Sequence, residues 1–277
     1  TPIKSSAASD VYKRQVLAFC VAAVLIGGVK RIASVSQIIV PFMAVIYIVF
    51  VLVLVVCNIT AVPAAFATIV KAAFSPKAIT GGAVGSFLVA MQKGVARGIF
   101  SNEAGLGSAP IAAAAAQTKE PVRQGLVSMT GTFIDTIVIC TLTGLSIVLT
   151  GAWQVDGLEG VQVTTYAFQN GLPLPKELSA FVLMLCLVFF AFTTILGWDY
   201  YSERCLEYLS GGRMKYVKVY RWIYILAVFI GPYMTVSAVW TIADIFNGLM
   251  ALPNMIALFA LSGVVVKETK HFFERHR

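Results

Sequence analysis

Polar and small residues gather at 93–110, in the middle of an otherwise apolar sequence. Arg97, Asn102 and Glu103 fall where an unbroken membrane helix would pass through hydrocarbon. A charged side chain at that depth costs about 2.5 kcal/mol or more, so an uninterrupted helix is unfavourable there. Gly105 and Gly107 follow closely and allow the backbone to leave helical geometry. The pattern predicts a polar interruption within a membrane crossing.

A second, short helix is expected directly after this interruption. Ser108 is a favourable N-cap residue, and Pro110 fits the first turn of a helix that continues through residues 111–117. Such a helix of about ten residues would be about 15 Å long, half of the hydrocarbon core. Non-helical backbone at that depth is tolerated only where it is buried in protein or lines a cavity. Two half-helices with a polar junction therefore favour a transport site.

The junction offers hydrogen-bond donors and acceptors from Ser101, Asn102, Glu103 and the peptide groups around Gly105 and Gly107. A half-helix N-terminus carries partial positive charge that suits a carboxylate, and a half-helix C-terminus presents carbonyls that suit a cation. A zwitterionic amino acid together with Na⁺ matches that polarity. The alternative is a kinked helix whose polar groups only satisfy one another.

A second candidate site lies in the apolar stretch 178–201, where Thr193 and Thr194 precede Trp198 by about one helical turn. Thr194 and Trp198 are four residues apart and project from one helix face. A threonine hydroxyl is the hard oxygen ligand that Na⁺ accepts. The alternative is that these hydroxyls bond back to carbonyls of their own helix.

Other polar side chains in apolar stretches are weaker candidates. Asp135 is an intramembrane acid, which suggests function, but it could equally hold two helices together. Arg97 could pair with Glu103 or extend toward the interface, as could Lys93. Two further residues near the last apolar stretch could be structural: Asp244 and Asn247.

Composition defines the class as an all-α integral membrane protein, because 58% of the 277 residues are hydrophobic and only 12% are charged. The net charge of +8 does not indicate nucleic-acid binding, since the basic residues lie between apolar spans. No motif of nucleophilic, zinc-dependent or nucleotide-dependent enzymes occurs in a suitable setting, so no enzyme is expected. The cysteines form no CxxC pair and are expected to be packing residues: Cys20, Cys57, Cys140, Cys186 and Cys205.

About seven membrane crossings are predicted, one of them discontinuous. They are 16–29, 36–58, the broken crossing within 83–118, 125–150, 178–201, 222–234 and 240–266. Residues 63–77 are expected to form a helix at the membrane interface, and 267–277 a charged tail. Residues 1–15 differ abruptly in polarity and are expected to be a non-native or disordered leader.

The distribution of basic residues predicts the orientation. If residues 83–118 cross once, the basic segments fall on one side: Lys30 and Arg31, Lys119 and Arg123, the 204–221 loop, and the tail. The positive-inside rule places this side, and the C-terminus, in the cytoplasm.

Residues 98–110, which read GIFSNEAGLGSAP, resemble the signature of the sodium:alanine (alanine or glycine:cation) symporter family. Three further stretches are similar to other parts of that family: 133–136, 197–208 and 246–254. The similarity covers essentially residues 16–277 as the transporter membrane domain. It implies a LeuT-type fold of five-plus-five inverted repeats, here partial, with 16–58 ending the first repeat and 83–266 forming the second.

The resemblance implies Na⁺-coupled symport of a small neutral amino acid, alanine or glycine, across the plasma membrane, with Na⁺ as coupling ion and no cofactor. It assigns substrate binding to six residues: Ser101, Asn102, Glu103, Gly105, Thr194 and Trp198. It assigns cation binding to Thr193 and Thr194. Asp199 contributes little to the assignment.

Family members are longer, so the sequence predicts an N-terminally truncated member without the broken helix of the first repeat. Three alternatives remain open: an inactive membrane fragment that lacks half of the binding site, H⁺-coupled uptake, and a channel. The residues do not distinguish alanine from glycine and do not indicate an oligomeric state.

Overall fold

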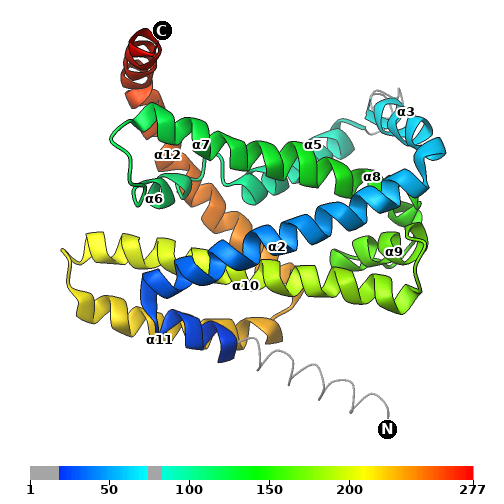
Figure 1. Ribbon diagram of the computed structural model, residues 1–277, viewed down its shortest axis with the longest axis horizontal. Coiled ribbons are helices and arrows are strands. Elements are labelled where there is room, and N and C mark those ends of the chain that lie inside the picture. The colour runs from blue at the N-terminus through cyan, green and yellow to red at the C-terminus, as the bar shows by residue number, and fades with distance from the viewer. Residues whose placement is uncertain (1–18, 74–82, 277) are drawn as a thin grey trace. The chain divides into compact units, whose positions relative to one another are not determined.

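A computed structural model describes residues 19–73 and 83–276, and every regular element in those ranges is a helix. The expected leader 1–15 and the 74–77 part of the expected interface segment lie outside the described residues. A short helical stretch at 19–25 comes first, and Figure 1 labels the α-helices that follow it. In chain order the elements are α2 (Gly28–Cys57), η1 (Ile59–Ala61), α3 (Val62–Ala73), α5 (Ala83–Asn102), α6 (Ala109–Ala113), α7 (Pro121–Phe133), η2 (Ile134–Cys140), α8 (Thr141–Leu149), η3 (Ala152–Gln154), α9 (Val161–Gly171), α10 (Lys176–Leu209), α11 (Met214–Ile230), η4 (Gly231–Tyr233) and α12 (Val236–Arg275).

Within the described residues, four helical segments are long and apolar enough to cross a membrane: Arg31–Cys57, Pro121–Leu149, Lys176–Leu209 and Ser237–Arg275. The protein is therefore a multi-pass helical membrane protein. These segments correspond to four of the seven predicted crossings, while the total of seven and the inverted-repeat fold stay predictions.

The chain divides into two compact units, and three long helices run from one unit into the other. Unit 1 comprises Thr1–Ile46 and Met184–Ala243. Unit 2 comprises Tyr47–Leu183 and Asp244–Arg277, and it contains the interruption between α5 and α6.

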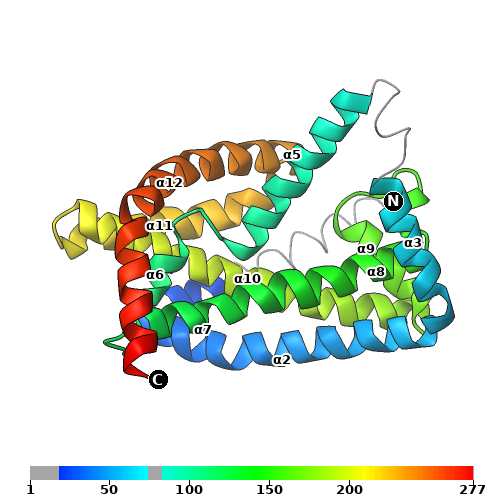
Figure 2. The ribbon, with the colours of Figure 1, turned by 90° about the horizontal axis from the view of Figure 1, so that it is seen from above.

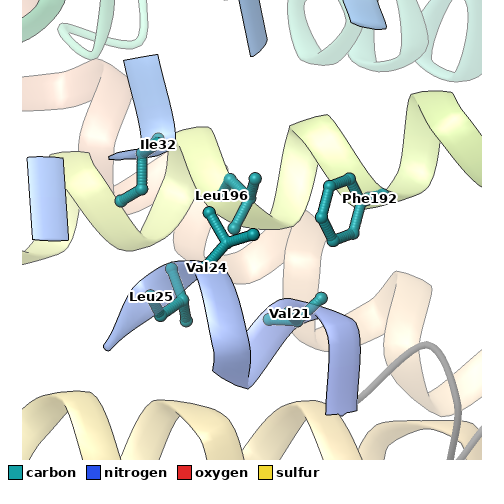
Figure 3. Close-up of a cluster of buried hydrophobic side chains, with 6 residues drawn as sticks. All are labelled: Val21, Val24, Leu25, Ile32, Phe192 and Leu196. Carbon is teal, nitrogen blue, oxygen red and sulfur yellow. The ribbon is translucent and has the colours of Figure 1, made fainter. Parts of the chain in front are cut away.

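The core of unit 1 forms where the stretch 19–25 and the start of α2 pack on α10 (Figure 3). Phe192 and Leu196 are four residues apart on α10, so one helix face presents both to the apolar neighbours. The buried members are Val21, Val24, Leu25, Ile32, Phe192 and Leu196. Lipid tails are as apolar as these side chains, so close van der Waals packing stabilises this contact more than removal from water does.

In unit 2, polar side chains reinforce the packing between the end of α2 and the α8–α9 region. Tyr47 Oη lies 2.6 Å from Thr143 Oγ1, and its ring stacks on Phe168 with centroids 5.9 Å apart. Asn58 Nδ2 donates to the carbonyl oxygens of Leu54 (2.8 Å) and Gly171 (3.0 Å). The Leu54 carbonyl also accepts the backbone N–H of Asn58 at 3.2 Å, whereas Gly171 is the last residue of α9, where carbonyls lack intrahelical partners.

Several predicted boundaries are wrong. Lys30 and Arg31 do not end a span, because α2 begins at Gly28 and continues through both of them to Cys57. The loop expected between 150 and 178 contains the helix α9. The charged tail from Lys267 is helical and continues α12 to Arg275. Polar helix-forming residues extend apolar spans beyond the hydrocarbon, so hydropathy alone places the helix ends too early.

Candidate functional site

The predicted interruption is present between α5 and α6 (Figure 2). Helix α5 ends at Asn102, and the next helix begins at Ala109. The linking backbone enters the left-handed region at Glu103 (φ 57°), Gly105 (φ 89°) and Gly107 (φ 84°). A left-handed conformation costs an L-residue about 1–2 kcal/mol, whereas glycine adopts it freely. Three such residues within five positions exclude a continuous helix.

Helix α6 is shorter than predicted. It spans only Ala109–Ala113, in place of a half-helix of about ten residues. Pro110 occupies the first turn as expected, but the hydroxyl of Ser108 makes no capping hydrogen bond. A five-residue helix has a weak dipole, so the predicted carboxylate site at its N-terminus loses its support.

Local side-chain bonds hold the interruption in shape. Ser108 is fully buried, and its Oγ donates to Glu103 Oε2 at 2.8 Å. The backbone N–H of Ala104 donates to Asn102 Oδ1 at 2.9 Å. Asn102 and Glu103 therefore stabilise the turn itself, in addition to any contact with a solute.

Helix α12 contacts the interruption through Asn254. Its Nδ2 donates to the carbonyl oxygen of Gly105 at 2.9 Å. A Cβ added at Gly107 would lie 3.2 Å from the Asn254 side chain, which is tighter than ordinary contact. Gly107 is thus required for both its backbone angle and its close approach to α12.

A π-helix, η2, faces the end of α5. Ser101 Oγ donates to Asp135 Oδ2 at 2.7 Å, and Asn102 Nδ2 donates to Thr136 Oγ1 at 3.1 Å. π-Helical turns inside α-helices are rare and occur often at functional sites. The sequence suggested a role for Asp135 but contained no signal for the π-helix that brings Asp135 and Thr136 to the junction.

The structure contradicts the expected partner of Arg97. Its Nη2 lies 2.5 Å from Asp244 Oδ1 and 2.7 Å from Asp244 Oδ2, so the pair joins α5 to α12 without Glu103. Beside this ion pair is a cavity of about 250 Å³ that reaches the interruption at Leu106. Its polar lining comes from Gln92, Asp244 and Asn247. Asp244 and Asn247, expected to be structural, therefore line a cavity as well.

The remaining predicted residues belong to α10, in unit 1. Thr193 is buried, and its Oγ1 donates to the carbonyl oxygens of Phe189 (3.0 Å) and Phe190 (3.1 Å), as in the structural alternative. Thr194 is half-buried. Trp198 packs edge-to-face on Tyr201, with ring centroids 5.6 Å apart.

The structure thus brings together four of the predicted residues at one junction in unit 2: Ser101, Asn102, Glu103 and Gly105. It places the α10 group separately in unit 1: Thr193, Thr194 and Trp198. Sequence analysis missed two residues of the unit 2 junction, Thr136 and Asn254. Both lie in stretches that resemble the family, 133–136 and 246–254, but hydroxyl and amide side chains are common in structural roles, so neither residue was singled out.

Apolar crossing helices and a helix interrupted by polar backbone define the class as helical membrane transport proteins. The chain belongs to the sodium:alanine symporter family, which it matches over residues 4–277. This is a family of transporters and not of enzymes, and sodium is the coupling ion of its members.

Three relatives illustrate the similarity. The chain is 55% identical to an uncharacterized transporter of Haemophilus influenzae over 261 residues, or 94% of this chain and 56% of the relative. It is 50% identical to the sodium/alanine symporter AgcS of Methanococcus maripaludis over 262 residues, or 94% and 56%. It is 41% identical to the probable sodium/glutamine symporter GlnT of Bacillus subtilis over 249 residues, or 90% and 51%. The chain spans about half the length of the curated relatives it matches.

Proposed function

We propose that the full protein carrying this chain is a Na⁺-coupled symporter of a small neutral amino acid, alanine or glycine, in the plasma membrane. The observation that carries this proposal is the interrupted helix of unit 2, with polar side chains and left-handed backbone beside a cavity. Such backbone is compatible with a membrane only where it is enclosed by protein or lines a pathway. Family membership supports the coupling to sodium.

The substrate site is proposed to form around the end of α5. Ser101 and Asn102 supply hydroxyl and amide groups, and Glu103 and Gly105 form the turn that exposes peptide groups. Asp135 holds the Ser101 hydroxyl, so the polar groups are oriented before a solute arrives. Oriented donors and acceptors bind a small solute with less loss of side-chain freedom than mobile ones.

The cation site is proposed to include Thr193 and Thr194 of α10 in unit 1. The Thr193 hydroxyl donates its hydrogen to backbone carbonyls, but its oxygen keeps lone pairs. The bond to the helix therefore fixes the oxygen in place and is compatible with a ligand role.

Alanine is proposed as the first substrate to test because one relative, at 50% identity, is named a sodium/alanine symporter. Another relative, at 41% identity, is named a probable sodium/glutamine symporter, so glutamine belongs in the same assay.

Uptake of labelled alanine into proteoliposomes that contain the full protein tests the function. We expect saturable uptake that requires an inward Na⁺ gradient and falls at least tenfold in Asn102→Ala. Gln154→Ala, in the η3 turn, is the matched control and should transport normally. Uptake that is indifferent to Na⁺, with the gradient verified, would reject the proposal. Exchange of internal for external alanine would distinguish a carrier from a channel.

A further inference from the structure

A buried group of ionisable side chains lies between α10 and α11 in unit 1, and it begins directly after Trp198 on α10. Glu203 is fully buried and forms a two-point ion pair with Arg221. Arg221 Nε donates to Oε1 at 2.5 Å, and Nη2 donates to Oε2 at 2.9 Å. Two parallel charge-assisted bonds of this kind satisfy both groups, so this pair is complete without a third charge.

Asp199 lies four residues before Glu203 on α10, hence one turn away on the same helix face. The side chain is fully buried. Among the residues that the structure describes, neither Asp199 carboxyl oxygen has a hydrogen-bond partner. Buried carboxylates are normally paired or hydrogen-bonded, because an isolated buried charge is strongly unfavourable.

The charges around Asp199 do not balance if it is ionised. Asp199 interacts with Glu203 on its own helix and with Arg221, Tyr220 and Tyr224 on α11. The Tyr224 hydroxyl donates to the carbonyl oxygen of Ile195 at 2.8 Å. An ionised Asp199 and Glu203 would then share the single guanidinium of Arg221, whose Nε and Nη2 already donate to Glu203.

Among the described residues, the charges that act on Asp199 are those of Glu203 and Arg221, and Arg31, at the start of α2, is exposed. The stretch 19–25 and the start of α2 contribute apolar side chains to the core beside Phe192 and Leu196. The unit 1 part of α12, residues 236–243, contains no titratable side chain. Neutralisation at Asp199 itself resolves the excess negative charge of the two carboxylates.

We propose that Asp199 is a proton-binding site, occupied by one proton near neutral pH when α10 and α11 are packed as described. A proton neutralises the group in place and needs no surrounding ligand shell. The resulting hydroxyl can donate to the neighbouring Glu203 carboxylate, since two close acids readily share one proton. A metal cation, in contrast, requires several oxygen ligands, and Asp199 offers only its own two. The site adds a proton to the ions that the full protein binds, independently of the proposed symport.

Infrared spectroscopy of the purified full protein in lipid nanodiscs tests this site without any transport assay. We expect the carboxylic-acid C=O band to lose one group per chain in Asp199→Asn, visible in the wild-type-minus-variant difference spectrum at neutral pH. The matched control is Glu207→Gln, on the same helix in the more exposed pair with Arg204, which removes an ionised carboxylate and should leave the acid band intact. Glu203→Gln removes the competing carboxylate and frees Arg221 for Asp199, so this variant should also lose the band. Asp199→Glu should shift the band and not abolish it.

An unchanged acid band in Asp199→Asn would overturn the proposal, as would a wild-type acid band that Na⁺ abolishes at constant pH. If Asp199→Asn does not fold, the Asp199→Glu spectrum decides alone: a shifted band supports the site, and an unshifted band rejects it. Loss of Na⁺-driven uptake in other variants would not affect this result, because the readout is the protonation of one side chain.

Discussion

At the residue scale, one set of side chains both shapes the interruption and supplies its chemistry. Glu103 accepts a hydrogen bond from Ser108 and holds a left-handed backbone, and Asn102 contacts both Ala104 and Thr136. Substitution of either residue therefore alters the fold of the turn together with its binding groups. Uptake measurements on such variants require a stability measurement beside them.

Of the two glycines in the turn between α5 and α6, Gly107 is expected to tolerate substitution by alanine less well. Gly107→Ala combines a left-handed φ of 84° with a Cβ contact of 3.2 Å to Asn254. Gly105→Ala meets only the φ strain, since nothing lies within 4 Å. We expect Gly107→Ala to lower stability by about 2–3 kcal/mol and Gly105→Ala by about 1–2 kcal/mol. Thermal unfolding in detergent measures both.

Gly98→Ala is the control for this pair, because Gly98 is helical with open space around it. Alanine should stabilise α5 slightly there, by up to about 1 kcal/mol. Equal losses in all three variants would show that the junction is more adaptable than the contacts at Gly107 indicate.

Arg221 is a second residue whose substitution is expected to lower the stability of the protein strongly. Arg221→Ala leaves Glu203 fully buried without its partner, and breaking a buried pair costs about 3–5 kcal/mol. Arg204→Ala removes a more exposed pair with Glu207, three residues away, which is worth about 0.5 kcal/mol. A large difference between their unfolding temperatures is expected. Equal stability of the two variants would mean that Glu203 finds another donor.

At the element scale, the π-helix η2 sets the register of the α7–α8 crossing relative to the end of α5. It presents Asp135 and Thr136 to Ser101 and Asn102. A π-turn carries extra residues relative to regular helix, so everything before it is rotated compared with an uninterrupted helix. The register, and not the residue types alone, creates these contacts.

Deletion of Val138, inside η2, should convert the π-turn to regular helix and rotate Asp135 away from Ser101. We expect uptake by the full protein to fall at least tenfold while the protein still inserts into the membrane. Deletion of Gly157, in the loop before α9, is the control and should reduce uptake less than twofold. Uptake that survives deletion of Val138 would show that the Asp135 contact is dispensable.

The sequence predicted the elements whose signals are local. The interruption followed from charges and glycines within a few residues. The contacts of the π-helix with α5 join residues 34 apart in the chain, and the Arg97–Asp244 pair joins residues 147 apart. Such contacts leave no mark in the composition of either segment.

At the scale of the whole molecule, the four apolar crossing segments found in the described ranges, 19–73 and 83–276, alternate with polar connections. The basic residues of the 204–221 loop and of the C-terminal end are predicted to face the cytoplasm. The acidic connection before α9 would then face outward. This topology is a property of the full protein in its membrane and is measurable by labelling.

Single cysteines in a cysteine-free background of the full protein test this orientation. In intact cells, a membrane-impermeant thiol reagent should label Trp153→Cys, in the exposed η3 turn, but should not label His276→Cys. Opening the cells should make His276→Cys reactive without changing Trp153→Cys. The reverse pattern would invert the predicted topology.

Glu103 is the one non-glycine residue with a positive φ among the residues that the structure describes, and this has an evolutionary consequence. Glycine at that position would remove the backbone strain, so a single substitution there is expected to increase the free energy of unfolding. A protein that keeps glutamate there has a less stable fold but retains a carboxylate at the junction. Laboratory selection for heat resistance alone should therefore erode this position first, while selection for growth on the transported nutrient should preserve it.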